Sequence, residues 1–275
     1  NLFQKVLFFL IFLLGNSSDF KIINSPNIRL ILQTLVVIFF ISSSNLNLEN
    51  TKIVFLDFLL RNLYFNLIFC SFCIIILVNG SNFIDGLNGL VSGYYIIVLF
   101  TLSKIGLTYE IVNENFLHLL IFVLTLTFIL NLFNRIYLGD SGSYLIGFFI
   151  GTLLISVYSK NSYLSPFYII LLIWYPCFEN LFSIIRKIYL KKSPTLADNN
   201  HFHQLNFFYI KKKSFLKKFN PNNVSSLIII IFNLITFIIG SNDPNNTKLQ
   251  ITLVSFNIIL YLIIYSKLLK FRYKY

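Results

Sequence analysis

Asn79-Gly80-Ser81-Asn82-Phe83-Ile84-Asp85-Gly86-Leu87-Asn88-Gly89-Leu90 places one carboxylate, three amides and three glycines between two long apolar runs. Exposed loops and unpaired polar groups do not occur in the hydrocarbon core of a bilayer unless they line a cavity or reach water. The rest of the chain is mostly apolar. The stretch therefore either reaches the membrane surface or forms a buried polar site.

The composition predicts an integral membrane protein. Of the 275 residues, 56% are hydrophobic and only 12% are charged, whereas ordinary soluble domains carry about 25% charged residues. We expect an all-α, polytopic transmembrane helical bundle in which residues 1–275 form a single integral membrane domain. A net charge of +12 would suggest a nucleic-acid partner in a soluble protein, but basic residues also collect in the cytoplasmic loops of membrane proteins. We therefore predict no nucleic-acid partner. The chain contains no methionine, and we expect further N-terminal spans to be missing.

Apolar runs of nearly 20 residues mark candidate membrane spans. A shorter stretch, Thr51–Leu60, is predicted to be interfacial or re-entrant. About nine spans are expected, near Leu2–Leu14, Ile28–Ser42, Leu63–Val78, Leu90–Leu107, Phe116–Leu132, Ser143–Tyr158, Tyr163–Leu190 (across Pro176), Val224–Gly240 and Leu249–Lys267.

Alternation across these spans divides the loops into two sets. One set comprises residues 15–29, 79–89, 131–142 and 186–223 with the tail after Tyr265, and it holds 16 of the 22 lysines and arginines. The positive-inside rule assigns this set to the cytoplasm, including a basic loop at 187–223. The acidic and histidine motifs described next fall in the same set, although the count used only lysine and arginine.

Two of these motifs combine an aspartate with glycine at the start of a span. If the chain is helical from Gly86 onward, Asp85 and Asn88 share one helix face. Asn134 precedes Gly139-Asp140-Ser141-Gly142-Ser143, which repeats the design. A helix N-terminus with glycines suits a phosphate group. The alternative is a simple helix cap with small-residue packing. It explains the motif at Asp85 equally well when that motif is taken alone. It does not explain why glycine stands beside the acid in both motifs.

A third motif, Asp198-Asn199-Asn200-His201-Phe202-His203-Gln204, lies in the basic loop. Two histidines bind either a metal or a phosphate, but zinc normally requires a third protein ligand. Magnesium held by aspartates and by substrate phosphates fits the inventory better. Asp19, followed by Arg29, is a fourth and weaker motif.

In order and content, these motifs resemble those of the polyprenyl-phosphate N-acetylhexosamine-1-phosphate transferases (the WecA/MraY-type superfamily). The most specific matches are residues 82–90 and 138–143. The segment from Pro176 through Glu179 and Arg186 to His203 resembles the stretch up to and including the family's histidine motif, in the short form of the WecA-like branch.

The resemblance implies transfer of a sugar-1-phosphate, expected to be HexNAc-1-phosphate, from a UDP-sugar such as UDP-N-acetylglucosamine to undecaprenyl or another polyprenyl phosphate, with release of UMP. Such a step initiates synthesis of cell-surface polysaccharides, in lipopolysaccharide or cell-wall biogenesis, at the cytoplasmic face of the bacterial inner membrane. Mg²⁺, or Mn²⁺ in its place, would bind Asp140 and Asp85. A homodimer is left open. The expected catalytic residues are Asp19, Asp85 and Asp140, and the expected substrate-binding residues are Asn82, Asn88, Asn134, Ser141, Gly142, Arg186, His201 and His203.

Three positions depart from the family pattern. Ser18 stands where an acid usually precedes Asp19, Asn88 replaces a common acid, and Gln204 stands where a further histidine is frequent. A catalytically impaired homologue is therefore one alternative. A transporter that uses intramembrane acids is another, but it predicts polar residues in mid-span, at both faces, and often an internal repeat, and the sequence has none of these features.

Overall fold

The computed structural model describes residues 2–106, 111–161, 163–194, 198–213 and 220–274. Within these ranges the chain is helical and contains no strand, as the sequence predicted. The helices are α1 (Leu2–Asp19), α2 (Pro26–Ser44), α3 (Val54–Leu60), α4 (Leu63–Ile84), α5 (Leu90–Lys104), α6 (Glu114–Leu132), α7 (Gly139–Lys160), α8 (Pro166–Tyr189), α9 (Phe202–Lys212), α10 (Pro221–Ser241) and α11 (Thr247–Lys274).

Among the described residues, eight helices are long and apolar enough to cross a membrane: α1, α2, α4, α6, α7, α8, α10 and α11. The ninth expected span begins at Leu90 as predicted, but α5 has only 15 residues, and residues 107–110 lie outside the described ranges. The stretch predicted to be too short to cross contains the seven-residue α3. The protein is thus a multi-pass membrane protein.

Local sequence signals explain where several helices begin. Proline occupies the first turn of α2, α8 and α10, where its missing N–H group is not needed. Asn62 caps α4, because its side-chain oxygen accepts hydrogen bonds from the backbone N–H groups of Tyr64 and Phe65 at 3.0 and 3.1 Å. Pro176 lies inside α8, and Gly80 of α4 packs directly against its carbonyl oxygen, where a Cβ atom would not fit.

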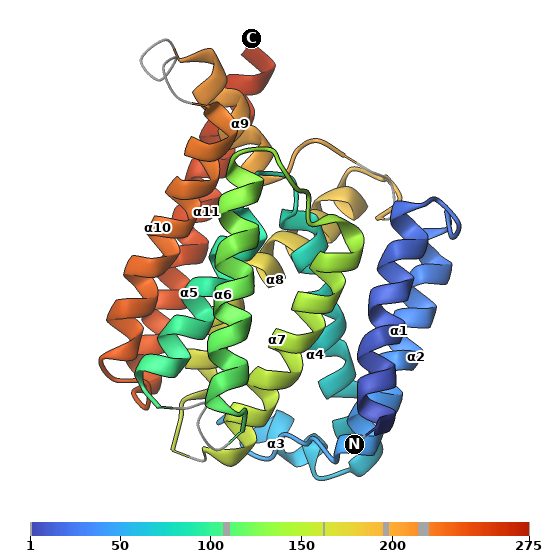
Figure 1. Cartoon of the computed structure of the whole chain (residues 1–275). Helices are drawn as coiled ribbons and strands as arrows, with labels where there is room; N and C mark the ends of the chain where they lie inside the picture. Colours follow the sequence, from blue (N-terminus) through green and yellow to red (C-terminus); the bar gives the residue numbers. More distant parts are fainter. Residues whose placement is uncertain (1, 107–110, 162, 195–197, 214–219, 275) are drawn as a thin grey trace.

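The helices pack as a bundle (Figure 1). Its buried side chains form two hydrophobic clusters. One cluster joins α4 to α11, and the other joins α1, α2, α4 and α7. Helix α4 packs against both α7 and α8, and α7 also packs against α1. Since α4 and α7 contribute to both clusters, they are the elements that hold the two halves together.

The loops gather at the two ends of the bundle as the predicted alternation requires. At the end that bears α3 (lower in Figure 1), the Tyr158 hydroxyl donates to the Asn50 carbonyl and Lys52 Nζ donates to Thr247 Oγ1. At the end that bears α9, the turns after α1, α4 and α6 lie together. The predicted basic loop 187–223 includes the last residues of α8 and all of α9; its residues 195–197 and 214–219 lie outside the described ranges.

Candidate active site

A cavity of about 760 Å³ opens between α2, α4 and α8 at the α9 end of the bundle. Towards the α9 end it is lined by polar and charged side chains: Arg29, Asn79, Asn82, Asp85, Asn180, Lys187, Asp198 and His201. Most of its remaining wall follows the membrane helices and is apolar, with Thr34 and Ser71 as exceptions: Leu30, Ile38, Ile68, Phe72, Ile75, Ile76, Leu181 and Ile184. The cavity therefore offers a charged site continuous with a surface suited to a hydrocarbon chain.

Asp140 lies in the first turn of α7 and is held by three neighbours. Its Oδ1 accepts a hydrogen bond from Asn82 Nδ2 at 2.6 Å. Its Oδ2 accepts from Arg29 Nη1 at 3.0 Å and from the Ser18 hydroxyl. Arg29 also donates to Ser18, so the serine that replaces an acid of the family pattern bridges the arginine and the aspartate.

Asp85 caps the C-terminus of α4 and lines the cavity. Burial, followed by the negative charges of Asp140 and Asp19, raises the pKa of the Asp85 carboxyl to about 8. Asp19 and Asp140 are therefore close enough for their charges to act on Asp85. Asp85 and Asn88 do not share a helix face, because the chain is not helical from Gly86 onward: residues 85–89 form turns, and α5 begins at Leu90 after Gly89, whose φ of 70° is in the left-handed region.

Asp19, at the end of α1, caps α7. Its two carboxylate oxygens accept hydrogen bonds from the backbone N–H groups of Asp140 at 2.9 Å and Ser141 at 3.1 Å. Gly139, at φ 68°, leaves no room for a Cβ beside this carboxylate. The α7 N-terminus, which the sequence predicted as a phosphate site, is thus occupied by Asp19. Ser141 contributes its backbone to this contact, and Gly142 packs against Leu138.

Asn88 and Asn134, both predicted to bind substrate, lie together but away from the cavity lining. Asn88 Nδ2 donates to Asn134 Oδ1 at 2.8 Å and to Asn223 Oδ1 at 3.2 Å. The backbone N–H group of Asn88 donates to Asn222 Oδ1 at 2.6 Å. In this structure the amides tie the turns after α4 and α6 to the start of α10.

Arg186 shapes the loop before the histidines. Its Nη2 forms an ion pair with Asp198 Oδ2 at 2.7 Å, and its Nη1 donates to the Asn200 carbonyl and the Tyr265 hydroxyl. Burial raises the pKa of Asp198, but the Asn200 N–H group and the Arg186 guanidinium outweigh it, so the pKa lies below its ordinary value. Arg186 does not line the cavity, whereas Asp198 does.

The two histidines stack on each other, with ring centroids 5.6 Å apart. His201 lines the cavity, and its Nδ1 lies 3.0 Å from Glu179 Oε1. His203 is completely buried beside Gly86, where an added Cβ would lie 2.4 Å from its Nε2. Burial lowers the pKa of His203 to about 4. Gly86 thus makes room for a histidine ring.

Besides Arg29, Asn79, Asn180 and Asp198, the site predictions omitted Lys187 and Glu179, which the structure also brings to this region. Lys187 lines the cavity, is only 4% exposed, and donates from Nζ to the Pro194 carbonyl at 3.0 Å. Glu179 is fully buried behind His201. A sequence signal was present, because Glu179, Ser183 and Lys187 recur at intervals of four residues and so share one face of an otherwise apolar helix. Among the described residues, no group of three or more His, Cys, Asp or Glu side chains could hold a metal by itself.

The sequence profile of glycosyl transferase family 4 matches residues 3–158. This range contains α1 to α7 almost completely, and with them Asp19, Asn82, Asp85 and Asp140. The match covers more than half of the 275 residues.

Three curated proteins are similar over nearly half of the chain. A probable undecaprenyl-phosphate N-acetylglucosaminyl 1-phosphate transferase of Bacillus subtilis is 33% identical over 46% of this chain and 36% of its own length. An undecaprenyl-phosphate alpha-N-acetylglucosaminyl 1-phosphate transferase of Thermotoga maritima is 28% identical over 47% and 39%. A decaprenyl-phosphate N-acetylglucosaminephosphotransferase of Mycolicibacterium smegmatis is 30% identical over 46% and 37%. The chain thus matches less than two fifths of each relative, and no match supports the transporter alternative.

Proposed function

The chain belongs to glycosyl transferase family 4, and from that premise we propose that it transfers HexNAc-1-phosphate from a UDP-sugar to a polyprenyl phosphate, releasing UMP. The relatives whose names print this type of reaction support the proposal, with N-acetylglucosamine as the first sugar to test. The proposal concerns the activity of the whole protein, whereas the chain matches less than two fifths of the length of each relative.

The observation that carries the proposal is the two-part cavity. Arg29 and Lys187, at the α9 end of the cavity, supply positive charge for phosphate groups, and the apolar wall along α2, α4 and α8 suits the isoprenoid tail. An enzyme whose substrates are all water-soluble would gain nothing from such a wall, because an apolar surface binds favourably only to a ligand that is also apolar. A polyprenyl phosphate has both parts in one molecule.

The reaction is a phosphoryl transfer in which positioning and charge neutralisation do most of the catalytic work. An oxygen of the polyprenyl phosphate attacks the sugar-bound phosphorus of the UDP-sugar. The bond between that phosphorus and the oxygen that bridges it to the uridine phosphate breaks, and UMP leaves with the bridging oxygen. Arg29 and Lys187 would balance the phosphate charges. His201 would contact the nucleotide-sugar.

We propose Mg²⁺ as the cofactor, with Asp85 and Asp140 as its protein ligands. Magnesium is commonly held by one or two carboxylates, with waters and substrate phosphates completing its coordination. Burial, followed by the negative charges of Asp140 and Asp19, raises the pKa of Asp85 to about 8. The donor set fits the pattern, because a cation between the carboxylates would offset the repulsion among these charges. When bound, Mg²⁺ would supply charge stabilisation of the transferring phosphoryl group. Mn²⁺ has the same ligand preference.

We further propose that the α9 end of the bundle faces the cytoplasm of a bacterial cell, where nucleotide-sugars are made, and that the protein lies in the inner membrane. The excess of lysine and arginine in the loops at this end supports this orientation. The product would be the lipid-linked first sugar of a cell-surface polysaccharide. A homodimer is a separate proposal, and the assay described below does not depend on it.

The test is release of UMP by the full-length protein in liposomes that contain undecaprenyl phosphate. A panel of UDP-N-acetylhexosamines and UDP-hexoses is supplied with and without Mg²⁺. We expect release with at least one N-acetylhexosamine donor, only when the lipid phosphate and a divalent cation are both present. Release that does not depend on the lipid would contradict the acceptor, and no release with any donor would support the impaired-homologue alternative.

Two substitutions test the site. We expect Asp85→Asn and Asp140→Asn each to lower UMP release at least about 100-fold, because each removes one negative charge from the proposed cation site. Asp57→Asn is the matched control: Asp57 accepts hydrogen bonds from Thr51 at 2.6 Å at the opposite end of the bundle. Full activity in either site variant would contradict the assignment.

A further inference from the structure

Glu179 is a completely buried carboxylate in a membrane-spanning helix, and it is surrounded by groups that can donate a hydrogen bond to it. Tyr261 donates its hydroxyl to Oε2 at 2.8 Å. The backbone N–H group of Phe202 donates to both oxygens, at 3.2 and 3.3 Å. His201 Nδ1 lies 3.0 Å from Oε1. Hydrogen-bond donors around a carboxylate favour its ionised form. An ionised carboxylate is only an acceptor, so the Nδ1 atom that faces it must carry the proton.

His201 is held between this carboxylate and the cavity. The ring is only 6% exposed, lies 5.4 Å from the ring of Phe83, and stacks on His203. Within the described residues, Nε2 of His201 has no hydrogen-bond partner, whereas Nδ1 has Glu179. Because the residue lines the cavity, Nε2 is the ring atom left to meet a ligand there.

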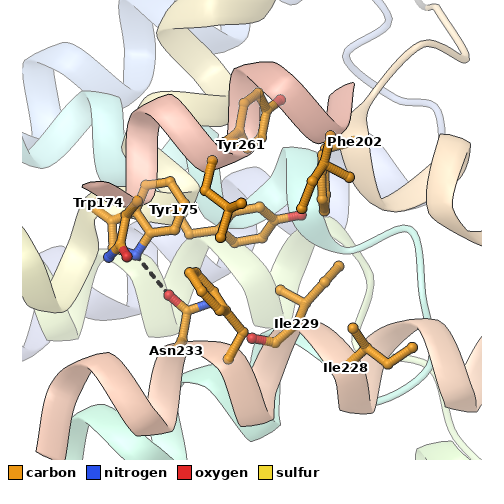
Figure 2. Close-up of a pocket in the computed structure, with 11 residues that line it drawn as sticks. Trp174, Tyr175, Phe202, Ile228, Ile229, Asn233 and Tyr261 are labelled. Carbon is orange, nitrogen blue, oxygen red and sulfur yellow. Dashed lines mark hydrogen bonds between the residues drawn. The ribbon is translucent and has the colours of Figure 1, made fainter. Parts of the chain in front are cut away.

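A wall of aromatic side chains backs Glu179 on the side away from the cavity. Phe202 of α9 stacks on Tyr261 of α11, with ring centroids 4.8 Å apart, and both border a small apolar cavity of about 130 Å³ (Figure 2). In the same wall, Trp174 Nε1 donates to Asn233 Oδ1 at 2.7 Å and so fixes α8 against α10 (Figure 2). The wall restricts water around the carboxylate and leaves it few alternative positions. Its bonds to His201 and Phe202 are therefore stronger than they would be in water.

We infer that Glu179 is a positioning residue for the proposed transfer: it keeps the proton of His201 on Nδ1 and directs Nε2 into the cavity towards the nucleotide-sugar. The inference rests on the proposed function for the identity of the ligand, but the geometry of the pair is independent of it. A carboxylate behind a histidine fixes both the tautomer and the orientation of the ring. Neither Glu179 nor Tyr261 lines the main cavity, so both act through His201.

The tautomer can be measured without any activity. The chain has three histidines, so ¹⁵N-histidine labelling with one substitution at a time assigns each ring. We expect Nδ1 of His201 to carry the proton across the pH range in which the full-length protein is folded. In Glu179→Gln, whose neutral amide is a weaker acceptor, we expect the Nε2–H tautomer to gain population. An Nε2–H tautomer in the unsubstituted protein would overturn the inference.

Kinetics provide the second test. We expect Glu179→Gln to lower kcat about 10- to 100-fold, as loss of a supporting partner commonly does, while KM for both substrates changes less than about threefold. Tyr261→Phe removes one of the hydrogen-bond donors to Glu179 and should lower kcat a few-fold. Tyr168→Phe is the matched control, because its hydroxyl bonds Ser241 Oγ at 3.0 Å instead.

A double-substitution cycle separates positioning from general damage. If Glu179 acts through His201, adding Glu179→Gln to His201→Asn should change kcat less than about twofold. Equal losses in both backgrounds would overturn the inference. If the unsubstituted protein shows no transfer with any donor, the proposed function fails, and the ¹⁵N measurement still decides whether Glu179 controls the tautomer of His201.

Discussion

At the residue scale, the burial of His203 is expected to make the stability of the protein depend on pH. Its pKa is lowered from 6.5 to about 4 by desolvation, and both ring nitrogens lack a partner among the described residues. Between these pH values the unfolded chain takes up a proton that the folded chain does not. The free energy of unfolding therefore falls as the pH drops from 6.5 towards 4, by up to about 3 kcal/mol.

Chemical denaturation of the protein in detergent at a series of pH values measures this dependence. We expect His203→Asn to be less stable at neutral pH, where its amide fills the ring space poorly, but to lose less stability on acidification than the unsubstituted protein. His118→Asn is the control, since His118 is exposed on α6. Parallel pH profiles for His203→Asn and the unsubstituted protein would exclude this origin of the acid sensitivity.

At the element scale, α1 and α7 are joined by Asp19 and Gly15. The Asp19 carboxylate accepts from two N–H groups of α7, and a Cβ at Gly15 would lie 2.2 Å from Ser141 Cα. We expect Asp19→Ala to cost about 1–2 kcal/mol, as loss of a helix cap does, and to lower UMP release because Asp140 shifts with the α7 N-terminus. Asn62→Ala, which removes the cap of α4 at the other end, should cost similar stability without lowering release. Equal effects on release would contradict a specific role for the α1–α7 contact.

The sequence predicted the elements well and the contacts between them poorly. The ends of the long apolar runs mark where each span begins and ends. Counting the spans then assigned the polar residues between them, among them Asp19, Asp85, Asp140 and His201, to one end of the bundle. The pairing of side chains depends on helix rotation and packing, which spacing alone does not determine. Spacing therefore predicted Asp19 as a catalytic acid but not as the cap of α7, and it did not predict the turn in which Asn88 bonds Asn134. The catalytic role of these acids stays a prediction.

At the scale of the whole molecule, all the candidate site residues converge on the α9 end, so the function depends on which way the bundle is inserted. The loops at that end carry most of the positive charge, which predicts that they remain in the cytoplasm. Single cysteines test this in intact cells with a membrane-impermeant maleimide. Lys21→Cys and Lys192→Cys mark the α9 end, and Glu49→Cys and Asp243→Cys mark the α3 end; all four positions are exposed.

We expect Glu49→Cys and Asp243→Cys to be labelled in intact cells, and Lys21→Cys and Lys192→Cys to be labelled only after permeabilisation. The native cysteines lie within the spans, buried or half-buried, so the protein without an added cysteine sets the background. The reverse pattern would place the cavity on the outer side, where a nucleotide-sugar donor made in the cytoplasm is not available. That outcome would contradict the donor as well as the orientation, because the charged residues that line the cavity lie at the α9 end of the bundle.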